Sequence, residues 1–510
     1  MQDVMCSMWR EGPRPGGDRG YTAAMPHLLT RRYWAAILPV ILLLASCGGG
    51  GSEREPRISD EDRAYGEEAH PQLLAEFGGA YGGPEARYLS DLGDRIAGAA
   101  GLSGQCTFTL VNTDVVNAFA VPGCYIYITR GLFAIVGSEA ELASVLGHEV
   151  GHIVGAHSQR QQRRSIWRTL GVIAVSLTGS ETLTRLAGQA AQYFTLRYSR
   201  GQEYESDELG IRYLARAGYD PHAAADMLQA LGRQSAFLTH TSGRDEASTI
   251  PEWASSHPLT GNRVERATEL AARVNADPDA LPENEIGYLR EVDGLLYADD
   301  PQQGFVLGRR FAHPVMRIGF EAPPGFSLTN SPQSIQLTGP DGLRGEFGGG
   351  PLPNGRLDLY AQALAEQIVG SGRARASATE ARINGMPALL LQLAVESRSG
   401  QVPISIAVYD GGDGGAYHFA ILSPPAQPNL DAIAALFRSF RRLSPPEAAQ
   451  LRPRVIRTVR AGPGDTIASF AARVADANPR ELFLMLNGLD AAQALQPGQL
   501  VKIVAFTAPQ

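Results

Sequence analysis

The sequence predicts a multidomain fold with three consecutive parts: a mainly α-helical domain around a small β-hairpin sheet, an α+β sandwich, and a short βααβ module. The chain has 510 residues, which is enough for about three domains. From Phe305 onward, short alternating patterns separated by turn residues replace longer helical patterns. In the tail, turn residues separate two predicted strands from two predicted helices. The predicted boundaries are 58–275 for the helical domain, 276–302 for a polar connector, 303–445 for the sandwich and 453–506 for the module.

A secretion signal is predicted near the N-terminus. Arg31 and Arg32 precede an apolar run over 35–45 that is short for a membrane span. The run leads into Leu-Ala-Ser-Cys, which matches the cleavage box of bacterial lipoproteins and makes Cys47 the predicted lipidated residue. We therefore predict a lipoprotein signal peptide over 1–47.

The residues around this signal refine the prediction. Residues 1–24 do not suit a signal peptide, so Met25 is the predicted true start. The glycines after Cys47 suit a flexible tether over 48–57. Gly48, in place of an aspartate, favours the outer membrane under the usual Gram-negative sorting pattern. The expected location is the periplasm, with a lipid anchor in the outer membrane.

The helical domain contains a helix with two histidines at metal-ligand spacing. Ser138 and Glu141 have the spacing of a capping box at its start. His148 and His152 are four residues apart, so both side chains lie on one helix face and can reach one metal ion. Glu149 stands beside them and can act on a water molecule. This pattern is typical of zinc peptidases.

A third metal ligand is predicted in a downstream acidic helix that starts near Leu186 and ends before Gly218. Glu203 and Asp207 are four residues apart on one face of it. Glu203 completes a His2Glu site with an open fourth position, and Asp207 suits an outer position that orients a ligand histidine. Glu205 is a competing carboxylate, but it lies about 200° around the helix from Glu203. We expect one Zn²⁺ ion per chain.

A third histidine from the same helix is excluded by the register of the sequence. Gly155 fits the extended zinc motif, but Ser158 stands at its third ligand position. His157 comes one residue too early. It is interpreted as a polar residue near the helix end and not as a ligand.

These motifs together resemble the HtpX-like and CAAX-prenyl-protease family of zinc metallopeptidases (gluzincins), most of all its soluble periplasmic branch. The resemblance covers about residues 60–275 and is carried by Asn-Ala-Phe at 117–119, Pro-Gly at 122–123, Tyr-Ile-Tyr-Ile-Thr at 125–129, Gly-Leu at 131–132, the zinc helix, and Tyr-Glu-Ser-Asp at 204–207. It implies a zincin-like fold, zinc ligands His148, His152 and Glu203, a general base Glu149, and a strand with Asn117, Ala118 and Phe119 that pairs with substrate. Cys124 departs from the family pattern, which commonly has a second glycine there.

The resemblance implies a zinc-dependent endopeptidase of the bacterial cell envelope whose substrates are unfolded or misassembled envelope proteins. An edge strand would hold an extended substrate through backbone hydrogen bonds. A further histidine, His257, lies in Ser-His-Pro-Leu-Thr before Arg263, which resembles a loop of the same branch near the metal. His257 can fill the open zinc position and keep the enzyme latent, stabilise the oxyanion, or merely cap the helix that begins near Leu259.

Two cysteines remain apart from Cys6 and Cys47. Cys106 and Cys124 flank the predicted hairpin and face an oxidising compartment. A disulfide and two buried thiols both fit this pattern. Neither CxxC spacing nor a nearby histidine accompanies them, so they are poor candidates for zinc ligands.

The sandwich predicted over 303–445 resembles a PsbP- or Mog-like domain. Strand-like alternation occurs at 316–320 and 404–408, and amphipathic helices are predicted near 357–369 and 429–440. No catalytic constellation is visible in this part. We interpret it as a binding or positioning module.

The tail resembles a LysM domain, which binds N-acetylglucosamine chains of peptidoglycan. A strand at 458–460 is followed by the turn Pro-Gly-Asp-Thr at 463–466, helices at 468–474 and 479–486, and a returning strand at 495–503. An extra residue before Pro463 and Phe470 at a usual aliphatic position depart from the LysM pattern. Packing on the peptidase domain is the alternative role.

The composition argues against nucleic acid as a partner. A net charge of −8 gives no basic footprint for nucleic acid. The apolar run Leu170–Leu177 is too short to span a bilayer.

The competing functions are an active zinc endopeptidase, a peptidoglycan-binding scaffold with an idle protease domain, and a cell-wall hydrolase. The intact Glu149 favours activity, and the zinc motif resembles peptidases more than amidases.

Overall fold

The computed structural model describes most of the chain after the predicted signal. The described residues are 56–160, 198–242, 253, 256–257, 261–275, 281–331, 333–370, 373–397, 400–412, 414–425 and 429–508. They belong to one compact unit, 55–510. The signal peptide with Cys47, most of the tether and the run at 170–177 lie outside the described residues. Within the described part, none of the helices combines the length and hydropathy that a bilayer crossing requires.

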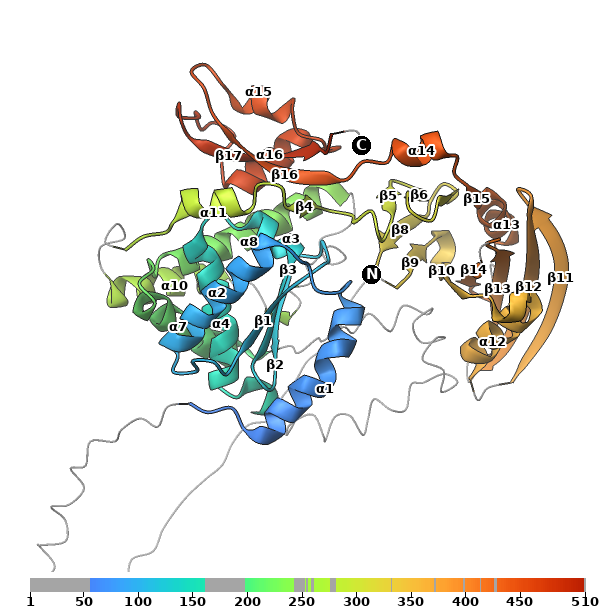
Figure 1. Ribbon diagram of the computed structural model, residues 1–510, viewed down its shortest axis with the longest axis horizontal. Coiled ribbons are helices and arrows are strands. Elements are labelled where there is room, and N and C mark those ends of the chain that lie inside the picture. Colours follow the sequence, from blue (N-terminus) through green and yellow to red (C-terminus); the bar gives the residue numbers. More distant parts are fainter. Residues whose placement is uncertain are drawn as a thin grey trace, which may run out of the picture. The chain divides into compact units, whose positions relative to one another are not determined.

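The first domain surrounds a three-stranded sheet with helices (Figure 1). The strands are β1 (Thr107–Val111), β2 (Ala118–Val121) and β3 (Tyr125–Thr129), in the spatial order β1–β3–β2. The helices are α1 (Asp60–Glu76), α2 (Pro84–Ala99), α3 (Arg130–Ile135), α4 (Glu139–Val154), α7 (Arg200–Arg216), α8 (Ala223–Ser242) and α10 (Gly261–Val274). β3 pairs in parallel with β1 and antiparallel with β2, so β2 is an edge strand.

Both faces of this sheet are covered, as the alternation of side chains along β2 requires. Ala118 and Ala120 belong to the main core, which they share with α2 and α4. Phe119 and Tyr127 face the other way and pack with Leu73 of α1. The rings of Phe119 and Tyr127 stack with centroids 4.7 Å apart. Helix α1 therefore closes one face of the sheet, and the metal-site helix α4 lies on the other.

Helix α4 starts with a cap that differs from the predicted box. The hydroxyl of Ser138 accepts a hydrogen bond from the backbone N–H of Glu141 (3.1 Å), as expected. The carboxylate of Glu141, however, accepts from the N–H of Gly137 (2.9 Å) and not from that of Ser138. The Glu141 carboxylate therefore satisfies the N–H of the residue before the N-cap, whereas a capping box would satisfy the N–H of the N-cap itself.

Glycines bring α4 and α7 into backbone contact. A Cβ atom at Gly147 would lie 3.0 Å from the carbonyl oxygen of Gly210, and one at Gly151 would lie 3.0 Å from that of Ser206. Such distances are tighter than almost all real Cβ contacts, so a side chain at either position would push the helices apart. This close approach places the histidines of α4 beside the carboxylates of α7.

The acidic helix is shorter than predicted at its start. Helix α7 begins at Arg200, where Ser199 caps it together with Gln202 in a capping box. Tyr198 and Ser199 are not helical, so the helix does not continue back towards Leu186 without a break. Its end agrees with the prediction, because Ala217 is the C-cap and Gly218 follows with a φ of 87°.

The second domain contains a seven-stranded antiparallel sheet in the order β11–β12–β13–β14–β10–β9–β8 and a four-stranded sheet in the order β15–β7–β6–β5. The strands are β5 (Phe305–Leu307), β6 (Arg310–His313), β7 (Ile318–Glu321), β8 (Ser327–Asn330), β9 (Ile335–Thr338), β10 (Arg344–Pro351), β11 (Ala374–Ile383), β12 (Met386–Ser397), β13 (Gly400–Asp410), β14 (Gly415–Leu422) and β15 (Arg441–Arg442). Helix α12 (Leu357–Val369) packs on one face of the larger sheet and α13 (Leu430–Ser439) on the other. Both helices were predicted, whereas the PsbP- or Mog-like assignment stays a prediction.

The C-terminal elements follow in the order βααβ: β16 (Arg454–Arg460), α15 (Ile467–Ala471), α16 (Pro479–Asn487) and β17 (Leu500–Phe506). Strand β17 starts later than predicted, because a turn with Gly498 at a φ of 93° precedes it. The assignment as a LysM domain stays a prediction. After α11 (Glu285–Glu291), the connector adds a short strand β4 (Leu296–Tyr297), which pairs with β16 and completes a β17–β16–β4 sheet.

The C-terminal module and the first domain share one core. Phe470, Phe483 and Ile503 belong to the same buried cluster as Leu142 of α4. Lys502, the only lysine in the sequence, is 1% exposed. Its amino group donates hydrogen bonds to the carbonyl oxygens of residues 134 (3.0 Å) and 136 (2.6 Å), at the end of α3. The module is thus fastened directly beside the start of α4.

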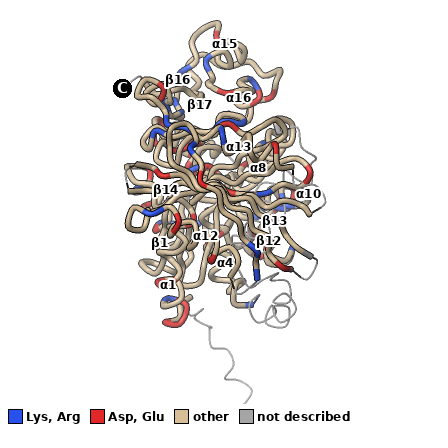
Figure 2. Tube along the Cα trace, turned by 90° about the vertical axis from the view of Figure 1, so that its right-hand side faces the viewer, with Lys and Arg blue, Asp and Glu red and all other residues tan. Residues whose placement is uncertain are grey.

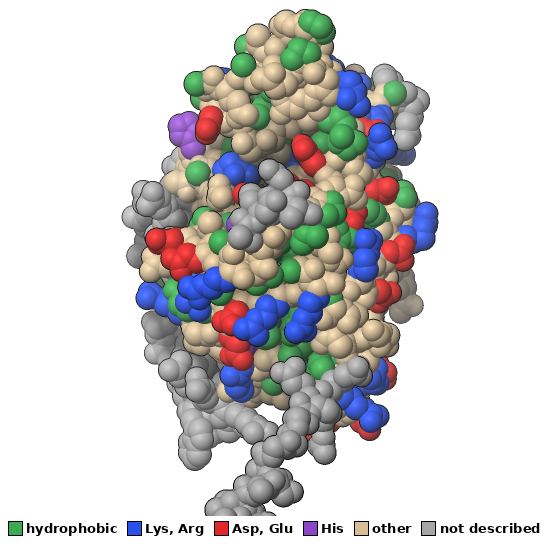
Figure 3. Space-filling view, turned by 90° about the vertical axis from the view of Figure 1, so that its left-hand side faces the viewer, with side chains coloured by type: hydrophobic (Ala, Val, Ile, Leu, Met, Phe, Trp, Pro, Cys, Tyr) green, Lys and Arg blue, Asp and Glu red, His purple; other side chains and the backbone are tan. Residues whose placement is uncertain are grey.

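The surface carries charges of both signs. Along the chain trace, basic and acidic residues alternate without separating into large blocks (Figure 2). On the face shown in Figure 3, blue and red side chains are interspersed and hydrophobic ones are scattered in small groups. The described part of this face therefore presents no continuous basic stripe.

Candidate metal centre

Four buried side chains from three segments converge on one point. They are His148 and His152 of α4, Glu203 of α7, and His257 in the segment before α10, and one atom of each lies within 4.8 Å of the others. The Nε2 atoms of His148 and His152 are 3.0 Å apart. Nδ1 of His257 lies 3.2 Å from Nε2 of His148 and 3.0 Å from Oε1 of Glu203.

This donor set fits a divalent cation. A neutral imidazole has one N–H and one acceptor nitrogen, so three ring nitrogens that face one another cannot all be satisfied by hydrogen bonds. A zinc ion, which takes nitrogen and oxygen donors, would accept all of them together with one carboxylate oxygen. Oε2 of Glu203 has no hydrogen-bond partner among the described residues, although it lies 2.9 Å from the guanidinium of Arg263. The other oxygen, Oε1, faces the histidines.

Asp207 lies behind His148 and is held by an arginine. Its Oδ1 atom is 2.9 Å from Nδ1 of His148. Arg263 of α10 donates to both carboxylate oxygens of Asp207, from Nε (2.9 Å) and Nη2 (2.8 Å). Burial alone would raise the pKa of Asp207, but the Arg263 guanidinium and His148 hold it well below its usual range. The carboxylate is therefore ionised and can fix the orientation of the His148 ring.

Glu149 is placed for proton transfer. It is fully buried, and neither carboxylate oxygen has a hydrogen-bond partner among the described residues. Nε2 of His257 lies 3.6 Å from the Oε1 atom of Glu149. Burial raises the pKa of Glu149 above its ordinary value. A carboxylate in such a place readily takes a proton from an adjacent water molecule.

Two aromatic residues that the sequence reasoning missed line the centre. Tyr198 stacks on the ring of His152 with centroids 3.8 Å apart, and Trp253 stacks on His257 at 5.0 Å. The backbone N–H of Tyr198 donates to the carbonyl of residue 256 (3.4 Å), which ties the His257 segment to the start of α7. The only local sign of Tyr198 is its place directly before Ser199, the N-cap of α7.

Two further residues occupy positions that the sequence reasoning did not anticipate. His157 is fully buried, and its Nδ1 atom lies 2.8 Å from Nδ1 of His152. Its other nitrogen lies 3.2 Å from Oε2 of Glu205. The interpretation of His157 as a polar residue at a helix end is therefore incomplete, since it touches a predicted ligand. Neither His157 nor Glu205 belongs to the four-residue cluster.

The predicted substrate strand lies at the sheet edge. The backbone N–H of Asn117 donates to the hydroxyl of Thr129 (3.0 Å), and the side-chain oxygen of Asn117 accepts from the N–H of Ala118 (2.9 Å). Phe119 follows in β2 and points towards α1. These bonds fix the start of β2, whose outer edge no described strand pairs with.

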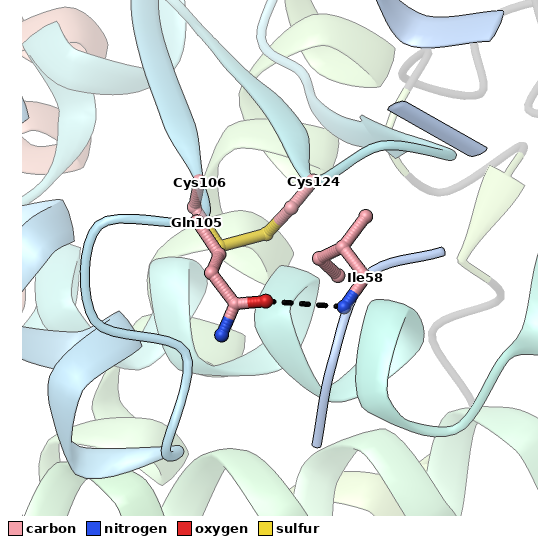
Figure 4. The surroundings of a disulfide bond; sticks show 4 residues. All are labelled: Ile58, Gln105, Cys106 and Cys124. Carbon is pink, nitrogen blue, oxygen red and sulfur yellow. Dashed lines mark hydrogen bonds between the residues drawn. A yellow bond between two sulfur atoms is a disulfide. The ribbon is translucent and has the colours of Figure 1, made fainter. Parts of the chain in front are cut away.

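Cys106 and Cys124 form a disulfide, one of the two alternatives that the sequence left open (Figure 4). It joins the start of β1 to the turn between β2 and β3. Cys124 has a φ of 60°, which favours glycine and agrees with the glycine that the resembled family commonly has there. Beside the disulfide, the side chain of Gln105 accepts a hydrogen bond from the N–H of Ile58 (3.1 Å). This hydrogen bond ties the chain before α1 to the segment that leads into β1.

Comparison with known proteins identifies the domain that holds this centre. Residues 84–271 match the model of peptidase family M48. This segment is similar to M48 metallopeptidase domains. The resemblance inferred from the zinc helix is thereby confirmed, and M48 peptidases use zinc, which the donor set above can bind.

Relatives from bacteria and mitochondria share this region. A "Beta-barrel assembly-enhancing protease" of Yersinia pestis is 31% identical over 252 residues, covering 47% of this chain and 50% of that protein. The protein of the same name from Escherichia coli is 29% identical over 220 residues, or 41% and 43% of the two chains. "Mitochondrial metalloendopeptidase OMA1" of Arabidopsis thaliana is 32% identical over 172 residues, or 34% and 32%. The chain thus spans half or less of the length of these relatives.

Proposed function

We propose that this protein is a zinc-dependent endopeptidase of the bacterial cell envelope that hydrolyses unfolded or misassembled envelope proteins. The observation that carries the proposal is the convergence of His148, His152 and Glu203 beside the unpartnered, buried carboxylate of Glu149. Two relatives named for β-barrel assembly support the envelope as the place of action. The lipoprotein signal expected over 1–47 supports a periplasmic protein anchored by Cys47 in the outer membrane.

The residues of the centre divide the work of hydrolysis. His148, His152 and Glu203 would hold the ion. When bound, zinc supplies a Lewis acid that polarises the scissile carbonyl and makes a water molecule more acidic. Glu149 takes a proton from the attacking water and later delivers it to the leaving amine. Through Asp207, Arg263 keeps the ring of His148 in one orientation.

His257 is best explained as a latch on the fourth position. Of the three roles that the sequence allows, helix capping receives the least support, because His257 faces the other ligands at 3.2 Å and 3.0 Å. In this place His257 would occupy the position that a substrate carbonyl would need at a four-coordinate zinc ion. His257 would have to leave this position for peptide hydrolysis to begin.

Strand β2 is the proposed docking edge for substrate. Its outer edge, which starts at Asn117, has no strand partner among the described residues. An extended polypeptide can add to such an edge through backbone hydrogen bonds. Such binding depends on the extended conformation of the substrate more than on its sequence. It would select unfolded segments over folded ones, which fits a quality-control peptidase.

The C-terminal module is proposed to serve the peptidase domain first. The shared core and the buried Lys502 support a packing role for it. Binding of peptidoglycan through a LysM-like surface remains a second proposal, supported by the βααβ order of its elements. Sedimentation with purified peptidoglycan tests this second role, and release of muropeptides would instead support the cell-wall hydrolase.

The function is tested with the full-length protein, casein and an unfolded β-barrel protein as substrates. We expect cleavage by the wild type, loss of cleavage by Glu149→Gln with zinc content unchanged, and loss of both in His148→Ala. Glu208→Gln is the matched control, because Glu208 is an exposed carboxylate of α7 that pairs with Arg212. Chelation should stop cleavage and added zinc should restore it. Equal cleavage by wild type and Glu149→Gln would reject the proposal.

A further inference from the structure

His157 contacts the side of His152 that points away from the other ligands. Its ring is fully buried, and the Nδ1 atoms of the two histidines are 2.8 Å apart. Nε2 of His152, by contrast, faces Nε2 of His148 at 3.0 Å. One ring nitrogen of His152 is therefore turned to the metal centre and the other to His157.

The protonation of both rings follows from this geometry. A histidine nitrogen that binds a cation carries no hydrogen, so the N–H of His152 must be at Nδ1. A contact of 2.8 Å between two nitrogens needs one donor and one acceptor, so Nδ1 of His157 accepts. The hydrogen of His157 is then at Nε2, which lies 3.2 Å from Oε2 of Glu205. The result is a chain of hydrogen bonds from His152 through His157 to Glu205.

Local backbone geometry holds the middle of this chain in place. Ala156 has a φ of 51°, which turns the chain after α4 so that His157 folds back under the helix. A Cβ atom at Gly155 would lie 2.5 Å from Nε2 of His157, so only glycine leaves room for the ring. The carbonyl of His157 also accepts from the side chain of Gln202 (3.2 Å). The ring is thus fixed by both α4 and α7.

The far end of the chain reaches the surface. The side chain of Glu205 is 45% exposed, and Arg160 donates to the same Oε2 atom (3.1 Å). His148 is supported differently, because its Nδ1 atom faces the buried carboxylate of Asp207. The two histidine ligands therefore receive unequal support: one from a buried ion pair, the other from a neutral ring and an exposed carboxylate.

We propose that His157 and Glu205 are positioning residues that fix the ring of His152 for zinc, as Asp207 does for His148. This inference rests on the proposed zinc site. Loss of the acceptor at His157 would leave the N–H of His152 buried without a partner and free the ring to turn. Residues that support metal ligands in this way typically change metal affinity about 10- to 100-fold when they are lost.

The test compares two substitutions at one position in the full-length protein. His157→Leu removes the acceptor, whereas His157→Gln retains an acceptor oxygen and an amide donor. Zinc affinity is measured by competition with a chromophoric chelator, and ligand geometry by the visible absorption of the Co²⁺-substituted protein. We expect His157→Leu to weaken zinc binding at least tenfold and to alter the Co²⁺ spectrum, and His157→Gln to restore most of both.

Glu205 provides the second arm and Glu208 its control. Glu205→Leu lies at the surface, so folding is expected to be retained, and we expect zinc affinity to fall several-fold. Glu208→Leu alters a neighbouring carboxylate of α7 without a link to a ligand and should leave affinity unchanged. Equal losses in His157→Leu and His157→Gln, or none in Glu205→Leu, would overturn the inference. If the wild type itself bound no zinc, the proposed function would fail instead.

Discussion

Arg263 and Asp207 form a two-pronged ion pair inside the protein, with hydrogen bonds of 2.9 and 2.8 Å to the two carboxylate oxygens. The same guanidinium lies 2.9 Å from Glu203 and over the ring of Trp253. One cation from α10 therefore balances two buried carboxylates that belong to α7. The site depends on this arginine even though it is not a predicted ligand.

Arg263→Leu should destabilise the fold and loosen the metal site together. Removing one partner of a buried ion pair leaves an uncompensated charge and costs about 3–5 kcal/mol. The free energy of unfolding in urea and the zinc affinity should both fall. Arg266→Leu is the control on the same helix, because Arg266 is exposed and lies over Tyr204. If both variants unfolded alike, the ion pair would not carry the stability assigned to it.

His257→Ala should raise peptidase activity while zinc stays bound. The substitution opens the fourth position and leaves His148, His152 and Glu203 unchanged. Initial rates of casein cleavage and zinc content give the comparison. A fall in activity with zinc retained would show instead that His257 assists the reaction, as a stabiliser of the oxyanion.

The disulfide should contribute measurable stability. It closes a loop with a sequence separation of 18 residues, for which chain entropy predicts about 3 kcal/mol. Cys106→Ser with Cys124→Ser should lower the melting temperature, and a reductant should lower that of the wild type to a similar value. The double variant itself should not respond to reductant. Identical melting of oxidised and reduced wild type would contradict the prediction.

Lys502 should make stability rise with pH above neutrality. Burial lowers the pKa of Lys502 from 10.5 to about 7, and a neutral amine still has two N–H groups for its two carbonyl acceptors. Above about pH 7 the unfolded chain keeps a proton that the folded chain releases, so the free energy of unfolding increases towards pH 10.5. Burial raises the pKa of Glu141 to about 7, so this carboxyl changes the slope of stability with pH only below about pH 7.

Urea unfolding at pH 7, 8 and 9 measures this effect against Lys502→Met. The slope of the wild type should exceed that of the variant by at most about 1.4 kcal/mol per pH unit. Parallel slopes would mean that the amine stays charged in the folded protein. Because the chain has no second lysine, an amine-reactive label gives an independent readout: Lys502 should react only after unfolding.

The sequence predicted those parts of the site that lie within one helix period. His148 and His152 are four residues apart, and so are Glu203 and Asp207. Each pair therefore lies on one face of its own helix, which follows from helix geometry alone. Helix α12 was predicted with its observed bounds for the same reason. Its periodic apolar positions pack on the sheet.

The missed residues depend on contacts between distant segments. Arg263 reaches Asp207 across 56 positions of the sequence, and nothing local marks that pairing. His157 lies near the helix end and outside the ligand group, as interpreted, but its burial follows from the left-handed Ala156, which turns it inward and which no local pattern marks. Strand β4 has only two residues and exists because β16 pairs with it, so no alternation pattern could announce it.

The pairing of β4 with β16 affects how the chain can fold during its synthesis. Residues 296–297 leave the ribosome long before residues 454–455, with which they pair. The carbonyls of residues 134 and 136 are made earlier still, and their partner Lys502 is made much later. Domains generally fold from the N-terminus as they are synthesised. The support beside the zinc helix is therefore synthesised after the helix itself, so a chain truncated before residue 454 would lack it.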